Sequence, residues 1–171
     1  MTEKQPVILT VTIETQNQRW FVAGITLSGE PIELMCSEPG NLTPYVGKEF
    51  DEQVSFLRHR LSGVLQRGCD RLWGRMMKPC QIVFITDDAF ADADDQLGCR
   101  VAEHFVQWMT RPPVVFYQCQ NGWSDPSEVK LDCLAGTIDD EVHQAFVNGL
   151  PALVGSLRHL ERWERASNAG K

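Results

Sequence analysis

The feature of this sequence that most constrains its fold is an apolar segment at residues 81–86, Gln-Ile-Val-Phe-Ile-Thr, which follows Pro79 and runs into Asp87 and Asp88. Four consecutive apolar residues between polar boundaries are typical of a strand buried on both faces. Such strands belong to parallel or mixed sheets that are covered by helices. Because ligands of these sheets bind at the carboxyl ends of the strands, Asp87 and Asp88 are predicted at the edge where a site would form.

Four further strands are predicted on either side of this segment. In residues 7–15, apolar side chains from Val7 to Ile13 alternate with polar ones, which is typical of a strand with one apolar face. The first three strands have short connections and should form an antiparallel meander. We expect the first strand to be central in the sheet, between the second strand and residues 81–86. The five predicted strands are residues 7–15, 19–27, 31–36, 81–86 and 114–119.

Helical patterns accompany the later strands. A long helix is predicted over residues 48–77, because apolar residues recur there at spacings of three and four. A second helix is predicted over residues 95–109, a third over residues 125–135, where Asp125 and Glu128 match a capping box, and a fourth from residue 137 onward. The pattern predicts one α/β domain over residues 1–171, with a frayed tail at about 167–171. The buried face of the long helix should carry Leu57, Leu61, Leu65 and Leu72.

Composition restricts the classes of function. The net charge of −7 argues against nucleic-acid binding through overall electrostatic attraction. The six cysteines include no C-x-x-C pair and none is spaced from a histidine as in a zinc finger, so they are expected to be reduced thiols. No apolar run approaches membrane-spanning length, and the N-terminus does not resemble a signal peptide. These features predict a cytoplasmic protein that does not enter a membrane.

The order of the predicted elements and one local motif resemble the ribonuclease H-like fold. The order covers residues 7–163, and the motif is Ile-Val-Phe-Ile-Thr-Asp at residues 82–87, which resembles the fourth strand of ribonuclease H-like nucleases with its catalytic aspartate. The resemblance implies a mixed five-stranded sheet, three antiparallel strands followed by parallel ones, with helices on its faces. It also implies carboxylates that hold two Mg²⁺ ions. The matching residues here are Glu14, Glu49 or Glu52, Asp87 or Asp88, and Asp139 or Asp140, so the set for a nuclease would be Glu14, Glu52, Asp87 and Asp139.

The first strand departs from the pattern of these nucleases. The family places an aspartate near the middle of this strand, where the chain has Thr10 and Thr12. A neutral hydroxyl cannot supply the charge that holds two cations close together. The sequence therefore predicts a non-catalytic binding, interaction or regulatory module without a cofactor. A Mg²⁺-dependent nuclease of ribonuclease H-like type is the alternative.

An acidic cluster follows the central apolar segment. Five aspartates lie between residues 87 and 95, and carboxylate oxygens are the ligands that divalent cations prefer. Asp87 and Asp88 are the candidate metal ligands. The spacing does not match an EF-hand, and the pattern favours the other interpretation, in which Asp92 and Asp94 cap the helix that follows and the rest lie in solvated turns.

A basic stripe and one tryptophan are candidates for partner binding. Arginines recur on one side of the long helix, where they would meet an acidic protein or phosphate, or only border the core. Trp123 lies in a turn-rich segment, from which a large aromatic side chain can anchor a partner or cover the domain's own core. The expected partner is a protein, and nucleic acid would be bound only through the stripe. The candidate residues are Arg60, Arg67, Arg71, Arg75 and Trp123.

Overall fold

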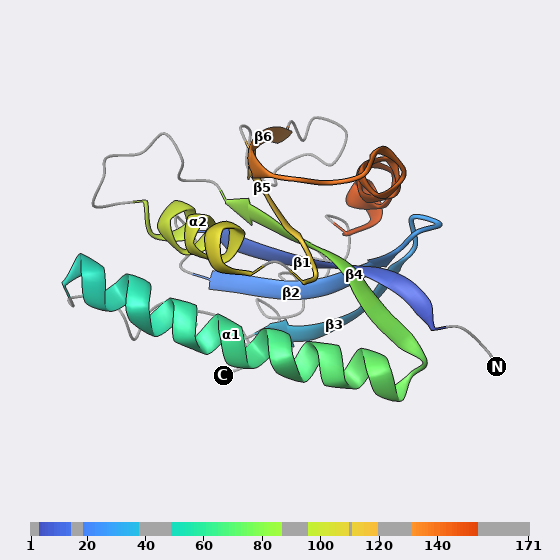
Figure 1. The fold of residues 1–171 in the computed structure, drawn as a ribbon, viewed down its shortest axis with the longest axis horizontal. Coiled ribbons are helices and arrows are strands. Elements are labelled where there is room, and N and C mark those ends of the chain that lie inside the picture. Colours follow the sequence, from blue (N-terminus) through green and yellow to red (C-terminus); the bar gives the residue numbers. More distant parts are fainter. Residues whose placement is uncertain are drawn as a thin grey trace, which may run out of the picture.

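The protein has an α/β fold in which helices cover both faces of a six-stranded mixed sheet (Figure 1). The computed structural model describes residues 4–14, 19–37, 49–86, 96–109, 111–119 and 131–153. The strands are β1 (Gln5–Glu14), β2 (Arg19–Thr26), β3 (Pro31–Ser37), β4 (Met77–Thr86), β5 (Val114–Cys119) and β6 (Leu131–Gly136). The helices of the described residues are α1 (Phe50–Gly74), α2 (Leu97–Trp108) and the helical residues 140–153.

The strands lie in the order β3-β2-β1-β4-β5-β6. β1 is antiparallel to β2 and parallel to β4, β4 is parallel to β5, and β2 and β3 are antiparallel. The prediction that the first strand lies between the second strand and residues 81–86 is therefore confirmed. Every residue from Val7 to Ile13 is buried, because helices cover the sheet on both faces here.

The prediction of five strands is wrong, because residues 131–136 form β6 and not the end of a helix over residues 125–135. β6 pairs antiparallel with β5 and satisfies backbone groups that would otherwise line an open edge. Tertiary pairing thus outweighs the local helix signal, whose capping residues lie outside the described part of the chain. Gly136 ends the strand at φ 94°, and a Cβ atom there would collide with the carbonyl oxygen of Val114. Glycine is required at this position.

Each face of the sheet has its own core. α1 and α2 cover one face, where Leu57, Leu61 and Leu65 of α1 pack on alternate residues of the strands. The predicted buried face of the long helix is confirmed, since Leu72 is buried as well. The helical residues 140–153 cover the other face through Phe146 and its neighbours. Figure 1 shows α1 running the length of the sheet, with the shorter α2 beside it.

Candidate functional site

The three parallel strands end at one edge of the sheet. Ile13 of β1 lies opposite Thr86 of β4, and Thr86 lies opposite Gln118 of β5. Glu14, the last residue of β1, and the chain that leaves β4 after Thr86 are therefore at the same edge. The predicted metal ligands Asp87 and Asp88, and the rest of the aspartate cluster to Asp95, lie outside the described residues.

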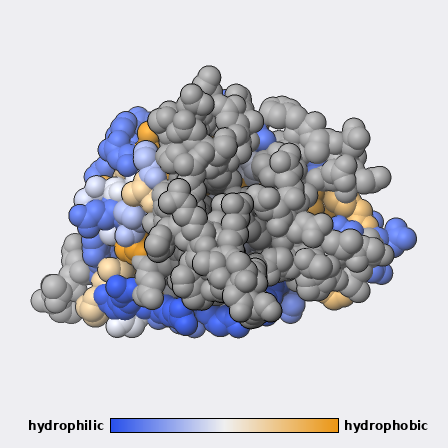
Figure 2. Space-filling model, turned by 180° about the vertical axis from the view of Figure 1, so that it is seen from behind, coloured by the Kyte–Doolittle hydropathy of each residue, from blue (hydrophilic) through white to orange (hydrophobic). Residues whose placement is uncertain are grey.

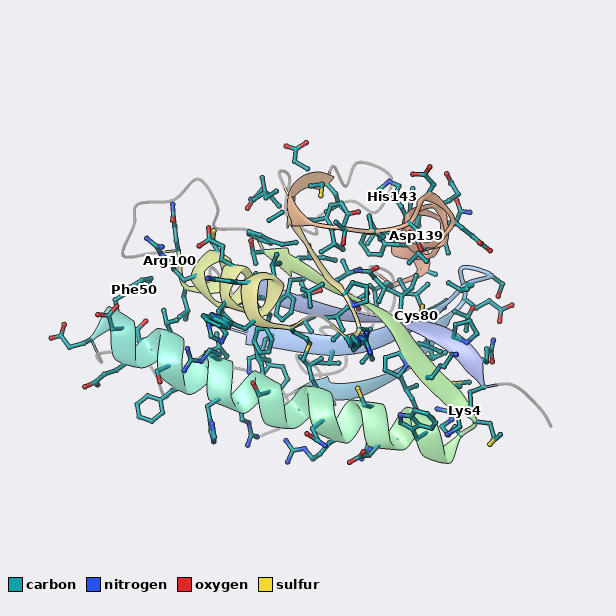
Figure 3. All side chains as sticks on the ribbon, viewed as in Figure 1. Lys4, Phe50, Cys80, Arg100, Asp139 and His143 are labelled. Atoms are coloured by element: carbon teal, nitrogen blue, oxygen red, sulfur yellow. The ribbon has the colours of Figure 1, made fainter. Side chains whose placement is uncertain are left out.

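Asp139 lies near the opposite ends of the parallel strands. Gln81, one residue before β4 begins to pair with β5, donates hydrogen bonds from Nε2 to the carbonyl oxygens of Pro113 (2.9 Å) and Thr137 (3.2 Å). Gln81 and Thr86 are five residues apart on one strand, or roughly 16 Å. Gly136 pairs with Val115 near the start of β5, and Asp139 follows three residues later. Asp139 therefore lies toward the amino ends of the parallel strands and away from Glu14 at their carboxyl ends; Figure 3 shows it beside His143 at the start of the helical residues 140–153.

The middle of the first strand is closed to a cation. Thr10 and Thr12 are both buried, and the Thr10 hydroxyl donates a hydrogen bond to the carbonyl oxygen of Ala23 at 3.2 Å. Glu49 and Glu52, at the start of α1, are exposed to solvent, as are Asp139 and Asp140. Among the described residues, no three His, Cys, Asp or Glu side chains lie close enough together to hold a metal ion.

Three arginines of the predicted basic stripe lie on one exposed side of α1. Arg60, Arg67 and Arg71 are exposed, and spacings of seven and four place them on the same side of the helix. The same spacing brings Phe56, which is 48% exposed, together with two glycines onto this side. We call this surface the arginine face; it consists of Phe56, Arg60, Gly63, Arg67, Arg71 and Gly74.

Other predicted partner-binding residues have different positions. Arg75 is exposed but lies just beyond α1, where its backbone N–H donates to the carbonyl oxygen of Leu72 and the N–H of Met76 donates to that of Trp73. Trp123 lies outside the described residues. Trp73, which the sequence did not single out, is half exposed and has the Lys4 ammonium 3.0 Å above its ring centre. Only the meeting of β1 with the end of α1 brings this cation–π pair together.

The opposite flank of α1 faces α2 across a groove of about 520 Å³. Arg58 Nη1 lies 3.4 Å from Nδ1 of His104; since a guanidinium only donates, Nδ1 accepts and the neutral ring carries its proton on Nε2. Burial, and secondly the charge of Arg58, lower the pKa of His104. Figure 3 shows Phe50 and Arg100 side by side at the helix starts. The lining residues are Phe50, Asp51, Val54, Arg100, Glu103, His104 and Gln107.

The two flanks of α1 differ in charge balance. In the groove Arg100 is 3.8 Å from Glu103, and Asp51 adds a second carboxylate, so acidic and basic groups oppose each other. The arginine face carries three guanidinium groups, and the exposed carboxylates of Glu52 and Asp70 lie beside it. Seen from behind in Figure 2, the lower rim of the molecule, along which α1 runs in Figure 1, is mainly hydrophilic. Of the two surfaces, the arginine face presents the greater excess of positive charge to a partner.

Comparisons with known proteins give no relative from which a function can be carried over. No family model matches the chain, no curated protein matches it, and no solved structure matches it. In the described part of the chain, no helix has the length and apolar character needed to cross a bilayer. The candidate site is therefore argued from the structure alone, and it is the arginine face of α1.

Proposed function

We propose that this protein is a non-catalytic, cytoplasmic binding module on a ribonuclease H-like sheet, and that its arginine face binds an acidic protein partner. One observation carries the proposal: three exposed arginines are gathered on one side of α1, in a chain whose net charge is −7. The carboxylates expected of a nuclease are not gathered in the same way, since Glu14 and Asp139 belong to opposite edges of the sheet.

The fold assignment within this proposal is supported by the sheet. Three antiparallel strands are followed by two strands parallel to β1, with β1 in the middle, which is the arrangement that the resemblance implies. β6 is an addition at the edge. The described cysteines Cys69, Cys80, Cys99 and Cys133 form no disulfide, which supports a reducing compartment such as the cytoplasm.

Electrostatics favour an acidic protein over nucleic acid as the partner. A nucleic acid presents a continuous row of phosphates, which the net charge of −7 repels beyond the few contacts that three arginines offer. A continuous row of phosphates would also pass exposed Glu52 and Asp70 beside the arginine face, whereas the carboxylates of a protein can be confined to positions opposite the arginines. A protein segment can match the three arginines locally, and arginine is enriched at the centres of protein interfaces.

The binding test uses a defined probe. The probe is a fluorescein-labelled helical peptide of about 20 residues, with glutamates on one side and leucines on the other. Fluorescence anisotropy should show binding to the parent, and Arg67→Gln/Arg71→Gln should weaken affinity about tenfold or more. Arg100→Gln/Arg111→Gln is the matched control, because it removes the same charge from exposed positions elsewhere.

Three results decide the binding proposal. An affinity of the control within about twofold of the parent supports a local arginine site, since screening limits the effect of distant charges. An equal loss in both variants, or no binding by the parent, overturns the proposal. Thermal unfolding should show that both double variants remain within about 0.5 kcal/mol of the parent, because all four side chains are exposed.

The alternative of a Mg²⁺-dependent nuclease is favoured by one observation. The pairing of Ile13 with Thr86 brings Glu14 to the edge where the chain continues into Asp87. The assay is cleavage of RNA, RNA–DNA hybrid or single-stranded DNA with Mg²⁺ or Mn²⁺, beside Glu14→Gln and Asp87→Asn. We expect no cleavage. Cleavage that both variants lose would replace the binding module by the nuclease.

A further inference from the structure

The centre of the arginine face is a glycine that the chain's own fold does not require. Gly63 lies in the interior of α1, eleven residues before the helix ends. A Cβ atom added there would meet no atom within 4 Å, and its φ is not in the left-handed region. Glycine destabilises a helix interior, since it has the most backbone freedom to lose. Neither packing nor backbone conformation therefore explains it.

The flanking residues indicate what the open position does. Arg60 and Arg67 precede and follow Gly63 on the same side of the helix, one turn away in each direction, and Phe56 extends the surface by one more turn. Because Gly63 has no side chain, it leaves a shallow depression on the helix surface between the guanidinium groups of Arg60 and Arg67. Such a shape lets the backbone of a partner approach α1 closely while its acidic side chains reach the arginines.

We propose that the partner is an acidic amphipathic helix that crosses α1 at Gly63; this inference rests on the proposed function of the arginine face. Arg60 and Arg67, which border Gly63, are seven residues apart, or roughly 10 Å along the helix axis, which is about the diameter of a helix. A helix that crosses at Gly63 is therefore flanked by these two arginines, with Phe56 one turn beyond Arg60 toward its apolar side. A second copy of α1 does not fit, because its own arginines would face these.

The test separates the role of Gly63 from that of the charges. Gly63→Ala should raise the melting temperature by about 2–4 °C, because alanine is the better helix former. The same change should weaken binding of the acidic helical peptide about threefold, and Gly63→Leu about tenfold, since larger side chains hold the peptide backbone away. Ser62→Ala is the control: it also improves helix propensity but lies on another side of α1.

Opposite signs for stability and affinity distinguish a docking contact from a structural one. A rise in melting temperature with loss of affinity for Gly63→Ala, and unchanged affinity for Ser62→Ala, is the expected result. Unchanged affinity of both Gly63 variants, with affinity still lost in Arg67→Gln/Arg71→Gln, overturns the close crossing but leaves the proposed function. Unchanged affinity in all of these variants overturns both.

Discussion

The two sides of α1 differ in what determines their residues. On the buried side, Leu61 and Leu72 pack on the sheet, and Gly68 lies among them. On the exposed side, Gly63 has open space around it and stands between arginines. Gly68 is thus part of the core, whereas Gly63, five positions earlier in the same helix, lies outside it. Packing on the sheet thus accounts for the residues of the buried side and does not account for Gly63.

The largest expected effect is on the buried side. Leu61→Asp should abolish soluble folding, because an unpaired charge buried in the core costs several kcal/mol, about the whole stability of a domain. Gln66→Asp, at an exposed position of the same helix, is the control and should fold normally. Circular dichroism of the purified variants is the measurement. A folded Leu61→Asp with the parent's melting temperature would show that the helix phase is wrong.

A smaller effect is expected where a glycine is required by the fold. Gly136→Ala should destabilise the protein by about 1–3 kcal/mol, because alanine is strained at a φ of 94° and its Cβ would collide with the carbonyl oxygen of Val114. Thermal unfolding of Gly136→Ala and Gly63→Ala should thus move the melting temperature in opposite directions. A shift of both melting temperatures in the same direction would contradict the claim that the fold requires glycine at position 136 and does not require it at position 63.

The smallest expected effect is on the flank of α1 that faces α2. The folded-state pKa of His104 is lowered, so the unfolded chain takes up a proton first as the pH falls. Stability should therefore decrease as the pH falls through about 6.5 toward the folded-state pKa. Melting temperatures at about pH 8 and about pH 5 should differ less in His104→Gln than in the parent. Equal differences would show that the folded protein does not lower the pKa of His104.

Much of the sheet could be predicted from sequence, because local patterns determine it. The buried segment before Asp87 and the alternation from Val7 to Ile13 each specify a strand, and the short early connections specify their neighbours. The edge strand β6 could not be predicted in this way. Its six residues alternate weakly, and it becomes a strand only because the edge of β5 is there to pair with.

The candidate site was predictable only in part. The spacing of Arg60, Arg67 and Arg71 already placed them on one side of a helix, and the same spacing would have found Gly63 and Phe56. The separation of Asp139 from Glu14 depends on the hydrogen bond from Gln81 to Thr137 across 56 residues. No local pattern contains a contact of that kind.

The central claim is that the arginine face is the partner-binding surface, and chemical-shift mapping tests it most directly. The ¹⁵N-labelled protein, at 19.3 kDa, suits backbone amide spectra with and without the acidic helical peptide. We expect the largest shift changes between Phe56 and Arg71, strongest around Gly63. Changes centred instead on Phe50 and His104, across the groove to α2, would contradict the claim and place binding on the other flank of α1.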